Sequence, residues 1–585
     1  MRNRPLGTRL RDAGLSIAVL AAAALVAAPA AAAAPVWVVP AGEKVFPSSV
    51  PGESTAVSLQ AAANEYEAAQ VAVTLAAPAA VTLSWDAGAD PLLVANAELF
   101  RVGYVIVTKP STGAGSRPGP YPDPLLPAQF GQPVDLPAGT TAFYVRVHVP
   151  PGAATGDYLG ALTVSGAGDP VAVPVSLHVW DFGWTRPSVH TAFAMSVASV
   201  MKSVAGVVDA TPENEAKLSD VYYRFFAEHW INVTGLRPRP PVDRDTGVVD
   251  TTGLAERFGP YLGLPGVDDG IFWDSAYPLS GGFPWGKLDP EAQRPQLETA
   301  ARDVLSFYRA HGWDRRAYFY VFDEPGPDAE IKAEKFAEVV HEVSAGLGFR
   351  ARVMLTDWPR PRTMGGRAAN AFLFDDVDVW CPSMYRYFLA LPALEDRKAE
   401  GSEVWWYSYA SHDIGRYPTF LIDEPLTEER AFTWMTWRYG ASGILYWGTT
   451  RWGDSVTGDP YRNPYLDPLS YGGRNRWYAN GEASLIYPGY EPSLGLTDPW
   501  APPVSSLRLE SLRDGIEDYE YLAMLQRALE KNKKLPKDKR RAYEALLEVP
   551  PEISRSMTDF ARDPAPIEQR RDAIAHALAE LNRND

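Results

Sequence analysis

The apolar residues of this chain follow two different rhythms, and the change between them near residue 185 limits the possible fold more than any other feature. From about residue 36 to 185 the apolar runs are short and broken by Pro and Gly, as at 70–75, 142–149, 158–164 and 171–180. Such short alternating runs are typical of an antiparallel β-sandwich. Beyond residue 186, apolar runs alternate with helical stretches over roughly 300 residues, which indicates a parallel α/β fold.

The second rhythm predicts an eight-stranded (β/α)8 barrel, since this architecture fits the length best. A doubly wound sheet is the alternative, but no Gly-rich phosphate turn follows the first strand. A proline at position 212 after Thr211 marks one helix start, and another helix begins near Ser505. The stretch 111–127, rich in Pro and Gly, is predicted to be a long loop. The expected strands lie at 190–197, 231–236, 317–322, 351–355, 377–381, 404–409, 420–422 and 444–447.

The N-terminus has the order of a secretory signal peptide. Four arginines between residues 2 and 11 precede an apolar run at 15–28 and small residues at 30–34. Cleavage near Ala34 would send the mature chain to the periplasm or the medium, and an uncleaved anchor helix is the alternative. The predicted organisation is a signal peptide at 1–34, a β-sandwich at 35–185, a barrel at 186–530 and a C-terminal helical segment at 531–585.

Charge and metal-ligand content exclude several classes of function. The net charge of −17 disfavours nucleic acid or an anionic membrane as the main partner, because both require a basic face. Cys381 is the single cysteine, so no disulfide framework or cysteine metal site is expected, and it is predicted to fill a buried strand. With eight histidines and no His-Glu-x-x-His pattern, we expect no metal and no cofactor. The sequence carries no signal for an oligomeric state.

The strongest chemical signal is an acid pair at the end of a predicted strand. An aromatic run at 317–322 leads directly into Asp323 and Glu324, and Pro325 stops the strand. In a barrel the C-terminal ends of the strands build the active site, so these two acids are the predicted catalytic residues. A capping or surface acid pair is the structural alternative.

A second copy of this pattern, Asp423-Glu424-Pro425, follows the predicted strand at 420–422. A helix opens immediately after it, so its acids could serve the N-terminal end of that helix. Asp423 is therefore a secondary candidate for the cleft.

Aromatic residues accompany polar groups at several other predicted strand ends. The chain contains 18 Trp and 28 Tyr, a surplus that suits the stacking of flat sugar faces, although large cores also bury these residues. A carboxylate beside the ring can accept hydrogen bonds from sugar hydroxyls. The predicted substrate-binding residues are Asp357, Trp358, Tyr385, Tyr446 and Trp447, together with Asp423.

Distinctive motifs occur in the front domain, in the predicted barrel and near the end of the chain, the last being the most specific. These stretches are Asn64-Glu65-Tyr66-Glu67 with Gln70, 121–127, Gly156-Asp157-Tyr158, 322–325, 443–447, Arg508-Leu509-Glu510 and 512–522. Taken together, they resemble the motifs of glycoside hydrolase family 123 and the related domain of unknown function 4091. The resemblance runs over nearly the whole chain after residue 34.

The resemblance implies a β-sandwich in front of a (β/α)8 barrel, and retaining hydrolysis of β-linked N-acetylgalactosamine without a metal. It further implies substrate-assisted catalysis, in which Glu324 serves as general acid and then base. Asp323 would hold the N–H of the 2-acetamido group, whose carbonyl oxygen attacks the anomeric carbon. Two adjacent side chains on one edge cannot easily flank opposite faces of a sugar ring, which agrees with this assignment.

Two other functions stay open from the sequence. One is a retaining glycosidase with two carboxylates on a different sugar, in which Glu324 is the acid/base and Asp357, Asp423 or Glu424 the nucleophile. The other is a non-catalytic carbohydrate-binding or surface protein that keeps the barrel. In all three cases the expected partner is a glycan or glycoconjugate.

Overall fold

The computed structural model of the chain describes residues 35–234, 240–264, 267, 273–274, 289–320, 322–410, 416–453, 461–472 and 477–583. The predicted signal peptide at 1–34 lies outside these residues. Pro35–Asp585 form a single compact unit. None of the helices among the described residues combines the length and apolar composition that a membrane crossing requires.

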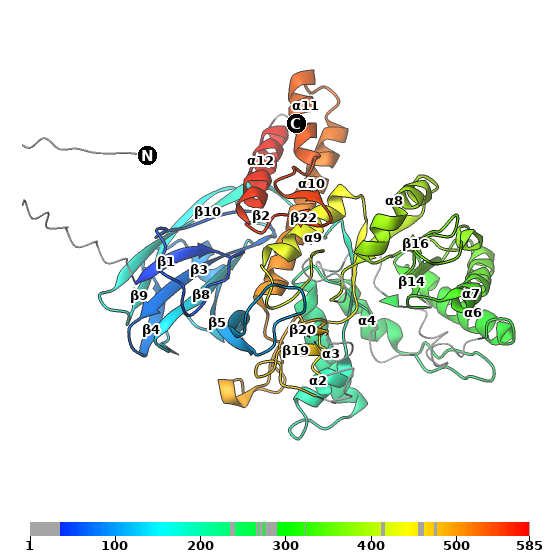
Figure 1. Cartoon of the computed structure of the whole chain (residues 1–585), viewed down its shortest axis with the longest axis horizontal. Helices are drawn as coiled ribbons and strands as arrows, with labels where there is room; N and C mark the ends of the chain where they lie inside the picture. Colours follow the sequence, from blue (N-terminus) through cyan, green and yellow to red (C-terminus); the bar gives the residue numbers. More distant parts are fainter. Residues whose placement is uncertain are drawn as a thin grey trace, which may run out of the picture. The chain divides into compact units, whose positions relative to one another are not determined.

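The first part of this unit is a sandwich of two five-stranded sheets, whose strands are blue to cyan in Figure 1. Valines and leucines from both sheets form one buried core, as their alternating pattern predicts. One sheet has the order β1 (Val36–Pro40), β3 (Tyr66–Leu75), β8 (Gly139–His148), β5 (Ala97–Val107) and β6 (Gly119–Ala128). The other has the order β2 (Val57–Ala63), β10 (Val171–Gly183), β9 (Gly156–Ser165), β4 (Ala79–Trp85) and β7 (Val134–Leu136).

The sandwich departs from the sequence prediction in two places. The prediction of a loop over 111–127 is wrong for residues 119–127, which belong to β6. This strand lies at the edge of its sheet, where proline is tolerated because one side of the strand needs no ladder N–H. The sandwich is also not wholly antiparallel, since β2 and β10 pair in parallel.

The second part is a curled sheet of eight parallel strands. In chain order these are β11 (His190–Ala194), β12 (Val233–Thr234), β13 (Trp273–Asp274), β14 (Ala317–Tyr320), β15 (Arg352–Leu355), β16 (Val379–Trp380), β17 (Glu403–Tyr407) and β18 (Gly443–Tyr446). The spatial order β12-β11-β18-β17-β16-β15-β14-β13 is the cyclic order of a (β/α)8 barrel. Among the described residues the ladder is open between β12 and β13. The strand predicted at 420–422 does not form; these residues run without strand pairing into a turn.

Helices cover the curled sheet and fill the C-terminal region. Thr211 caps the helix that Pro212 opens, as the sequence predicts, by accepting a hydrogen bond from the Asn214 N–H. The helices are α1 (Pro91–Asn96), α2 (Val197–Ser203), α3 (Pro212–Ala227), α4 (Leu254–Leu262), α6 (Arg294–Ala310), α7 (Pro327–Gly346), α8 (Met384–Ala399), α9 (Thr427–Arg438), α10 (Leu507–Lys531), α11 (Lys537–Glu544) and α12 (Ala565–Asn582). Two small hairpins, β19–β20 (Leu469–Gly472, Tyr478–Asn480) and β21–β22 (Ser554–Ser556, Asp559–Phe560), and three short 3₁₀ helices (Ala371–Leu373, Pro492–Leu494 and Ala545–Leu547) complete the described elements.

Side chains on the parallel strands alternate between two environments, as the period of two requires. Phe319, Trp380 and Trp406 belong to the large core that includes the surrounding helices. Tyr318 and Trp405 belong to a separate buried cluster that also contains Cys381. Cys381 is therefore buried as predicted, but it directly follows β16 and does not lie within a strand.

Buried ion pairs join the sandwich to the start of α10. Arg508 donates from Nε and Nη2 to the two carboxylate oxygens of Asp123 on β6, at 3.0 and 2.8 Å, and both side chains are fully buried. Arg146 on β8 likewise donates to Glu510, at 2.8 Å. Because such pairs are stable only with their partners in place, they hold the two parts of the chain as one compact unit.

We expect Asp123→Ala to destabilise the protein strongly, because it leaves Arg508 buried without its carboxylate. The expected loss in free energy of unfolding is about 3–5 kcal/mol. Chemical denaturation monitored by fluorescence measures it. The control is Asp559→Ala, which breaks the exposed pair with Arg555 and should not shift the midpoint measurably. Equal midpoints for the two variants would contradict the structural role of Asp123.

Candidate active site

A cavity of about 710 Å³ opens at the C-terminal ends of the parallel strands. Its carboxylates are Asp323, Glu324 and Glu482, and aromatic side chains form much of the remaining wall. Apolar rings with a few convergent polar groups are the usual composition of a small-molecule site. The aromatic lining residues are Tyr318, Tyr320, Tyr407, Tyr409, Tyr446, Trp447 and Tyr471.

The acid pair follows β14, where the chain leaves the sheet. Phe322 is buried, whereas Asp323 and Glu324 are exposed to the cavity. Glu324 has φ = 44°, a left-handed conformation that is uncommon for a residue with a side chain. Such backbone strain persists only where the surroundings enforce it, and it concentrates at functional sites. The turn lets two neighbouring side chains reach one cavity, which a regular strand would not allow.

Thr356, directly after β15, links the two acids. Its hydroxyl donates to Asp323 Oδ1 at 2.9 Å and accepts from the backbone N–H of Glu324 at 2.7 Å. Tyr320 donates to the same Asp323 oxygen at 2.6 Å. Since Tyr320 ends β14 and Thr356 directly follows the neighbouring strand β15, the register of these two strands sets the position of the pair.

Glu324 is held by two further side chains. The Tyr407 hydroxyl, from the end of β17, donates to its Oε1, and Arg386 Nη2 lies 3.8 Å from its Oε2. Burial, together with the neighbouring carboxylates, raises the pKa of Tyr407 and of Tyr320 well above the ordinary value. Both phenols therefore stay protonated at neutral pH and act as hydrogen-bond donors to the acids.

Asp357 is not brought to the cavity. Its carboxylate is fully buried and accepts hydrogen bonds from Arg360 at 2.8 Å and Arg367 at 3.2 Å. Arg367 also donates to the backbone carbonyl of Pro325, the residue after Glu324. Asp357 thus supports the acid pair indirectly, because it orients Arg367, which binds the backbone next to Glu324.

Trp358 and Tyr385, predicted to bind substrate, also do not line the cavity. Trp358 is buried, and its ring is covered by the guanidinium groups of Arg360, Arg367 and Arg386 at 4.6–4.8 Å. Tyr385 lies in the first turn of α8 and is 44% exposed. Trp358 therefore orders the cations behind the acids rather than presenting a stacking face.

The second acid pair has a structural environment. Asp423 is buried and accepts from the N–H and hydroxyl of Ser111, both at 2.6 Å, and from the Ser116 hydroxyl at 2.7 Å. Burial, with a contribution from Glu428, raises the pKa of Glu424 to about 9, so this carboxyl is neutral at pH 7. Asp423 anchors a loop of the sandwich, and neither acid lines the cavity.

Tyr446 and Trp447 do lie at the cavity, and they lead to a carboxylate that the sequence prediction missed. Glu482 is buried, accepts from the Trp447 indole N–H and from the Tyr446 hydroxyl at 3.5 Å, and lines the cavity. It follows the short hairpin β19–β20 rather than a strand of the parallel sheet, so the pattern of strand ends does not include it. The one local sequence feature that could have indicated Glu482 is the run Asn480-Gly481-Glu482, a turn sequence that ends in an acid.

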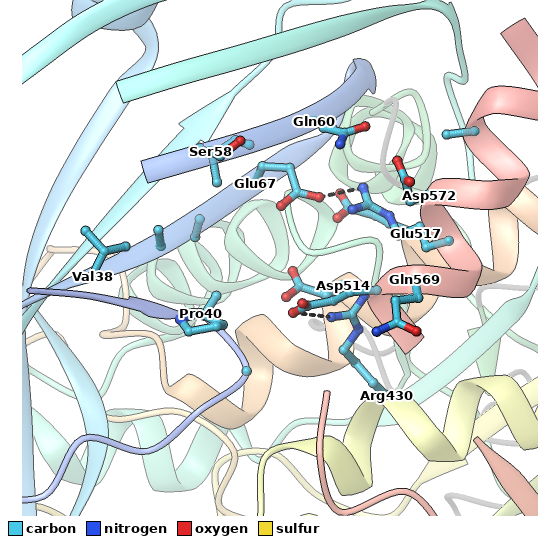
Figure 2. Close-up of a pocket in the computed structure, with 18 of the residues that line it drawn as sticks. Val38, Pro40, Ser58, Gln60, Glu67, Arg430, Asp514, Glu517, Gln569 and Asp572 are labelled. Carbon is cyan, nitrogen blue, oxygen red and sulfur yellow. Dashed lines mark ion pairs between the residues drawn. The ribbon is translucent and has the colours of Figure 1, made fainter. Parts of the chain in front are cut away.

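A second cavity, of about 510 Å³, lies between the sandwich and helices α9, α10 and α12 (Figure 2). Its charged groups are largely paired, as in Glu67 with Arg571 at 2.5 Å. Burial raises the pKa of Glu67 and of Asp514 to about 7. Because this cavity is lined by the domain junction and not by strand ends, we assign it a structural role.

Within the described part of the chain, no three or more His, Cys, Asp or Glu side chains are grouped so that they could hold a metal ion. The acids of the main cavity instead bond to hydroxyl groups and an indole.

Part of the chain is similar to a known family of catalytic domains. Residues 288–525 match the family described as glycoside hydrolase 123, catalytic domain. The fold resembles that of a family 123 glycoside hydrolase from Clostridium perfringens, with a TM-score of 0.66, 13% identity, and coverage of 94% of this chain and 98% of that one. A comparison with curated protein sequences gives no significant match.

Two further solved structures align at low similarity. A family 39 glycoside hydrolase from Bacteroides cellulosilyticus WH2 has a TM-score of 0.34 and 11% identity, over 79% of this chain and 81% of that one. Bacteroides uniformis beta-glucuronidase 3 has a TM-score of 0.25 and 10% identity, over 66% and 45%.

We expect Thr356→Val to lower hydrolytic activity while leaving the fold intact, since valine keeps the shape but loses the hydroxyl that links the two acids. The expected fall in kcat/KM is about tenfold or more, because the acids lose their relative orientation. Thr74→Val, which removes a hydroxyl pair with Thr140 in the sandwich, is the matched control. Unchanged kinetics in Thr356→Val would show that this hydroxyl does not position the acids.

Proposed function

Because residues 288–525 match the catalytic domain of glycoside hydrolase family 123, we propose that this chain is a retaining β-N-acetylhexosaminidase of the galactosamine type. The reaction uses the 2-acetamido group of the substrate as nucleophile. The observation that carries this proposal is that the acid pair, Asp323 and Glu324, occupies consecutive positions at one edge of the cavity.

Adjacent acids favour substrate assistance over a double displacement with two carboxylates. In the latter, the carboxyls approach opposite faces of the sugar from about 5–5.5 Å apart. Consecutive residues on one turn face the substrate from the same side. Glu324 then protonates the leaving oxygen and afterwards deprotonates the water that opens the cyclic intermediate.

Asp323 is arranged to hold the acetamido group. The described hydrogen bonds from Tyr320 and Thr356 both end on Oδ1, so Oδ2 is available as an acceptor for the amide N–H. An aligned N–H turns the acetamido carbonyl oxygen toward the anomeric carbon and stabilises the positive charge that develops on the amide. The aromatic wall, including Trp447, supplies apolar surface for the sugar ring.

The proposed natural substrate is the glycan of a glycolipid or a similar glycoconjugate. The structural neighbour from Clostridium perfringens is described in terms of glycolipid glycan hydrolysis, which supports this class. The described cavity, lined by seven aromatic side chains and three carboxylates, has the composition that a sugar with one apolar face requires.

The first test is a panel of nitrophenyl β-glycosides, with and without a 2-acetamido group. We expect hydrolysis of the 2-acetamido sugars, and a loss of about 100- to 10,000-fold in kcat for Glu324→Gln and for Asp323→Asn. Efficient hydrolysis of sugars that lack the acetamido group would overturn substrate assistance.

Glu482 gives the two-carboxylate alternative a specific candidate nucleophile, because it is the third carboxylate among the described residues of the cavity. A 2-deoxy-2-fluoro glycoside separates the mechanisms. Substrate assistance predicts no covalent adduct by mass spectrometry and competitive inhibition by a thiazoline analogue of the cyclic intermediate. An adduct on Glu482 would establish the alternative instead.

We also propose that the chain is exported and that its mature form begins near residue 35. The support is the order of four arginines, an apolar run and small residues at 1–34. Expression of the full chain in a bacterial host should yield a periplasmic or secreted product whose N-terminal sequence starts close to Pro35. An unprocessed, membrane-bound product would support the anchor alternative.

A further inference from the structure

Glu482 is the one cavity carboxylate, among the described residues, that the proposed mechanism does not use. Its side chain is buried, with 1% exposure, although the residue contributes to the cavity wall. Burying a carboxylate costs free energy unless hydrogen bonds compensate for the lost water. The hydrogen bonds of Glu482 therefore indicate what this side chain does beside the cavity.

The bonds to Glu482 come from two aromatic residues of the cavity. The Trp447 indole N–H donates to Oε1, and the Tyr446 hydroxyl, which itself accepts from the Ala483 N–H at 2.8 Å, donates to Oε2 at 3.5 Å. An indole offers a single donor, so this bond restricts how the Trp447 ring can turn. Glu482 therefore sets the orientation of an aromatic face in the cavity.

The turn that carries Glu482 is backbone-strained. Gly481 has φ = 81°, and Ala483 has φ = 53°, a left-handed value that is unusual for alanine. A Cβ added at Gly481 would lie 2.8 Å from Arg508 Nη1 and 2.7 Å from Ile422, so the turn requires glycine here. This strain is maintained by contacts that lie outside the turn.

Arg508 supplies those contacts. The same guanidinium that pairs with Asp123 of the sandwich donates to the carbonyls of Gly481 at 3.1 Å and Ser484 at 2.8 Å, one on each side of Glu482. Ser111, also from the sandwich, accepts from the Asn480 N–H at 2.9 Å. The front domain therefore fixes the turn from which Glu482 reaches the cavity.

From this geometry we propose that Glu482 is a sugar-recognition residue: it accepts a hydrogen bond from a hydroxyl of the bound sugar and holds Trp447 for stacking, while the sandwich keeps it in place through Arg508. The proposal rests on the proposed function, in that the ligand is a sugar in the same cavity. It adds a specificity determinant and gives the front domain a role in substrate binding.

The chemistry of the group fits this role. An ionised carboxylate offers about four acceptor positions, and Trp447, Tyr446 and the backbone N–H of Ala410 occupy three. A sugar hydroxyl can take the remaining one. Burial raises the pKa of Glu482 to about 7, although Trp447, Ala410, Tyr446 and Arg508 all favour its ionised form. Recognition should therefore weaken as the pH falls below about 7.

The test compares Glu482→Gln with Glu424→Gln. Both replace a buried carboxyl whose pKa is raised, but Glu424 does not line the cavity and is already neutral at pH 7. Glu482→Gln should raise KM about 10- to 100-fold with less than about a tenfold change in kcat, because it removes a charged acceptor used in binding. Glu424→Gln should match the native protein. A loss of kcat as large as that of Glu324→Gln would overturn the proposal, because it would identify a nucleophile.

Monodeoxy substrates identify the hydroxyl. In a monodeoxy series, one glycoside should bind the native protein more weakly than the parent glycoside does. The same two glycosides should bind Glu482→Gln with equal affinity. The native kcat/KM should also show an ionisation near pH 7 that Glu482→Gln lacks. If every deoxy substrate is penalised equally in both proteins, Glu482 does not touch the sugar.

Binding separates this proposal from the proposed function. Calorimetry with N-acetylgalactosamine, N-acetylglucosamine and galactose on Glu324→Gln, alone or combined with Glu482→Gln, requires no turnover. Weaker binding of at least one sugar to the double variant supports the proposal even if no nitrophenyl glycoside is hydrolysed, and equal binding of all three sugars overturns it.

If Glu482→Gln does not fold, Trp447→Phe is the second variant, because it keeps an aromatic ring but removes the N–H. It should also raise KM. An unchanged KM would contradict the proposed role of the pair Glu482 and Trp447.

Discussion

The ion pair between Arg508 and Asp123 is the interaction on which the rest of the structure depends. Fully buried, it joins the edge strand of the sandwich to the first turn of α10, and the same guanidinium binds carbonyl groups of Phe420, Gly481 and Ser484. A buried arginine is tolerated only when its donors are satisfied, so these segments must meet for any of them to be stable. This requirement explains why Pro35–Asp585 form one compact unit although the sequence has two rhythms.

The cavity at the strand ends depends on this junction on one side and on the parallel sheet on the other. The sheet places Asp323 and Glu324 at the end of β14, where Thr356 and Tyr407 from other strands hold them. The junction holds Glu482, which comes from a turn outside the parallel sheet. The acid pair proposed to perform the chemistry is thus held by side chains at the ends of other strands of the parallel sheet, whereas the acid proposed to recognise the sugar is held by the front domain.

Sequence reasoning located the acid pair but overestimated how many neighbours share its cavity. Tyr446 and Trp447 line the cavity, whereas Asp357, Trp358 and Tyr385 do not. The error has a physical cause: an acid beside an aromatic at a strand end can either face the ligand or, as Asp357 does, bind arginines that support the site. Tyr407 and Glu482 were missed because their roles depend on contacts with residues 83 and 35 positions away.

Local sequence patterns suffice to predict the features that short-range periodicity and chain termination encode. These are the two kinds of sheet, the burial of Cys381 and an acid pair at the end of β14, because side-chain alternation and a strand-stopping proline act over a few residues. Long-range contacts, in contrast, make 119–127 an edge strand, let Asp423 anchor a sandwich loop and bring Glu482 to the cavity. These outcomes depend on which distant donors satisfy each buried polar group, and no local pattern specifies that partner.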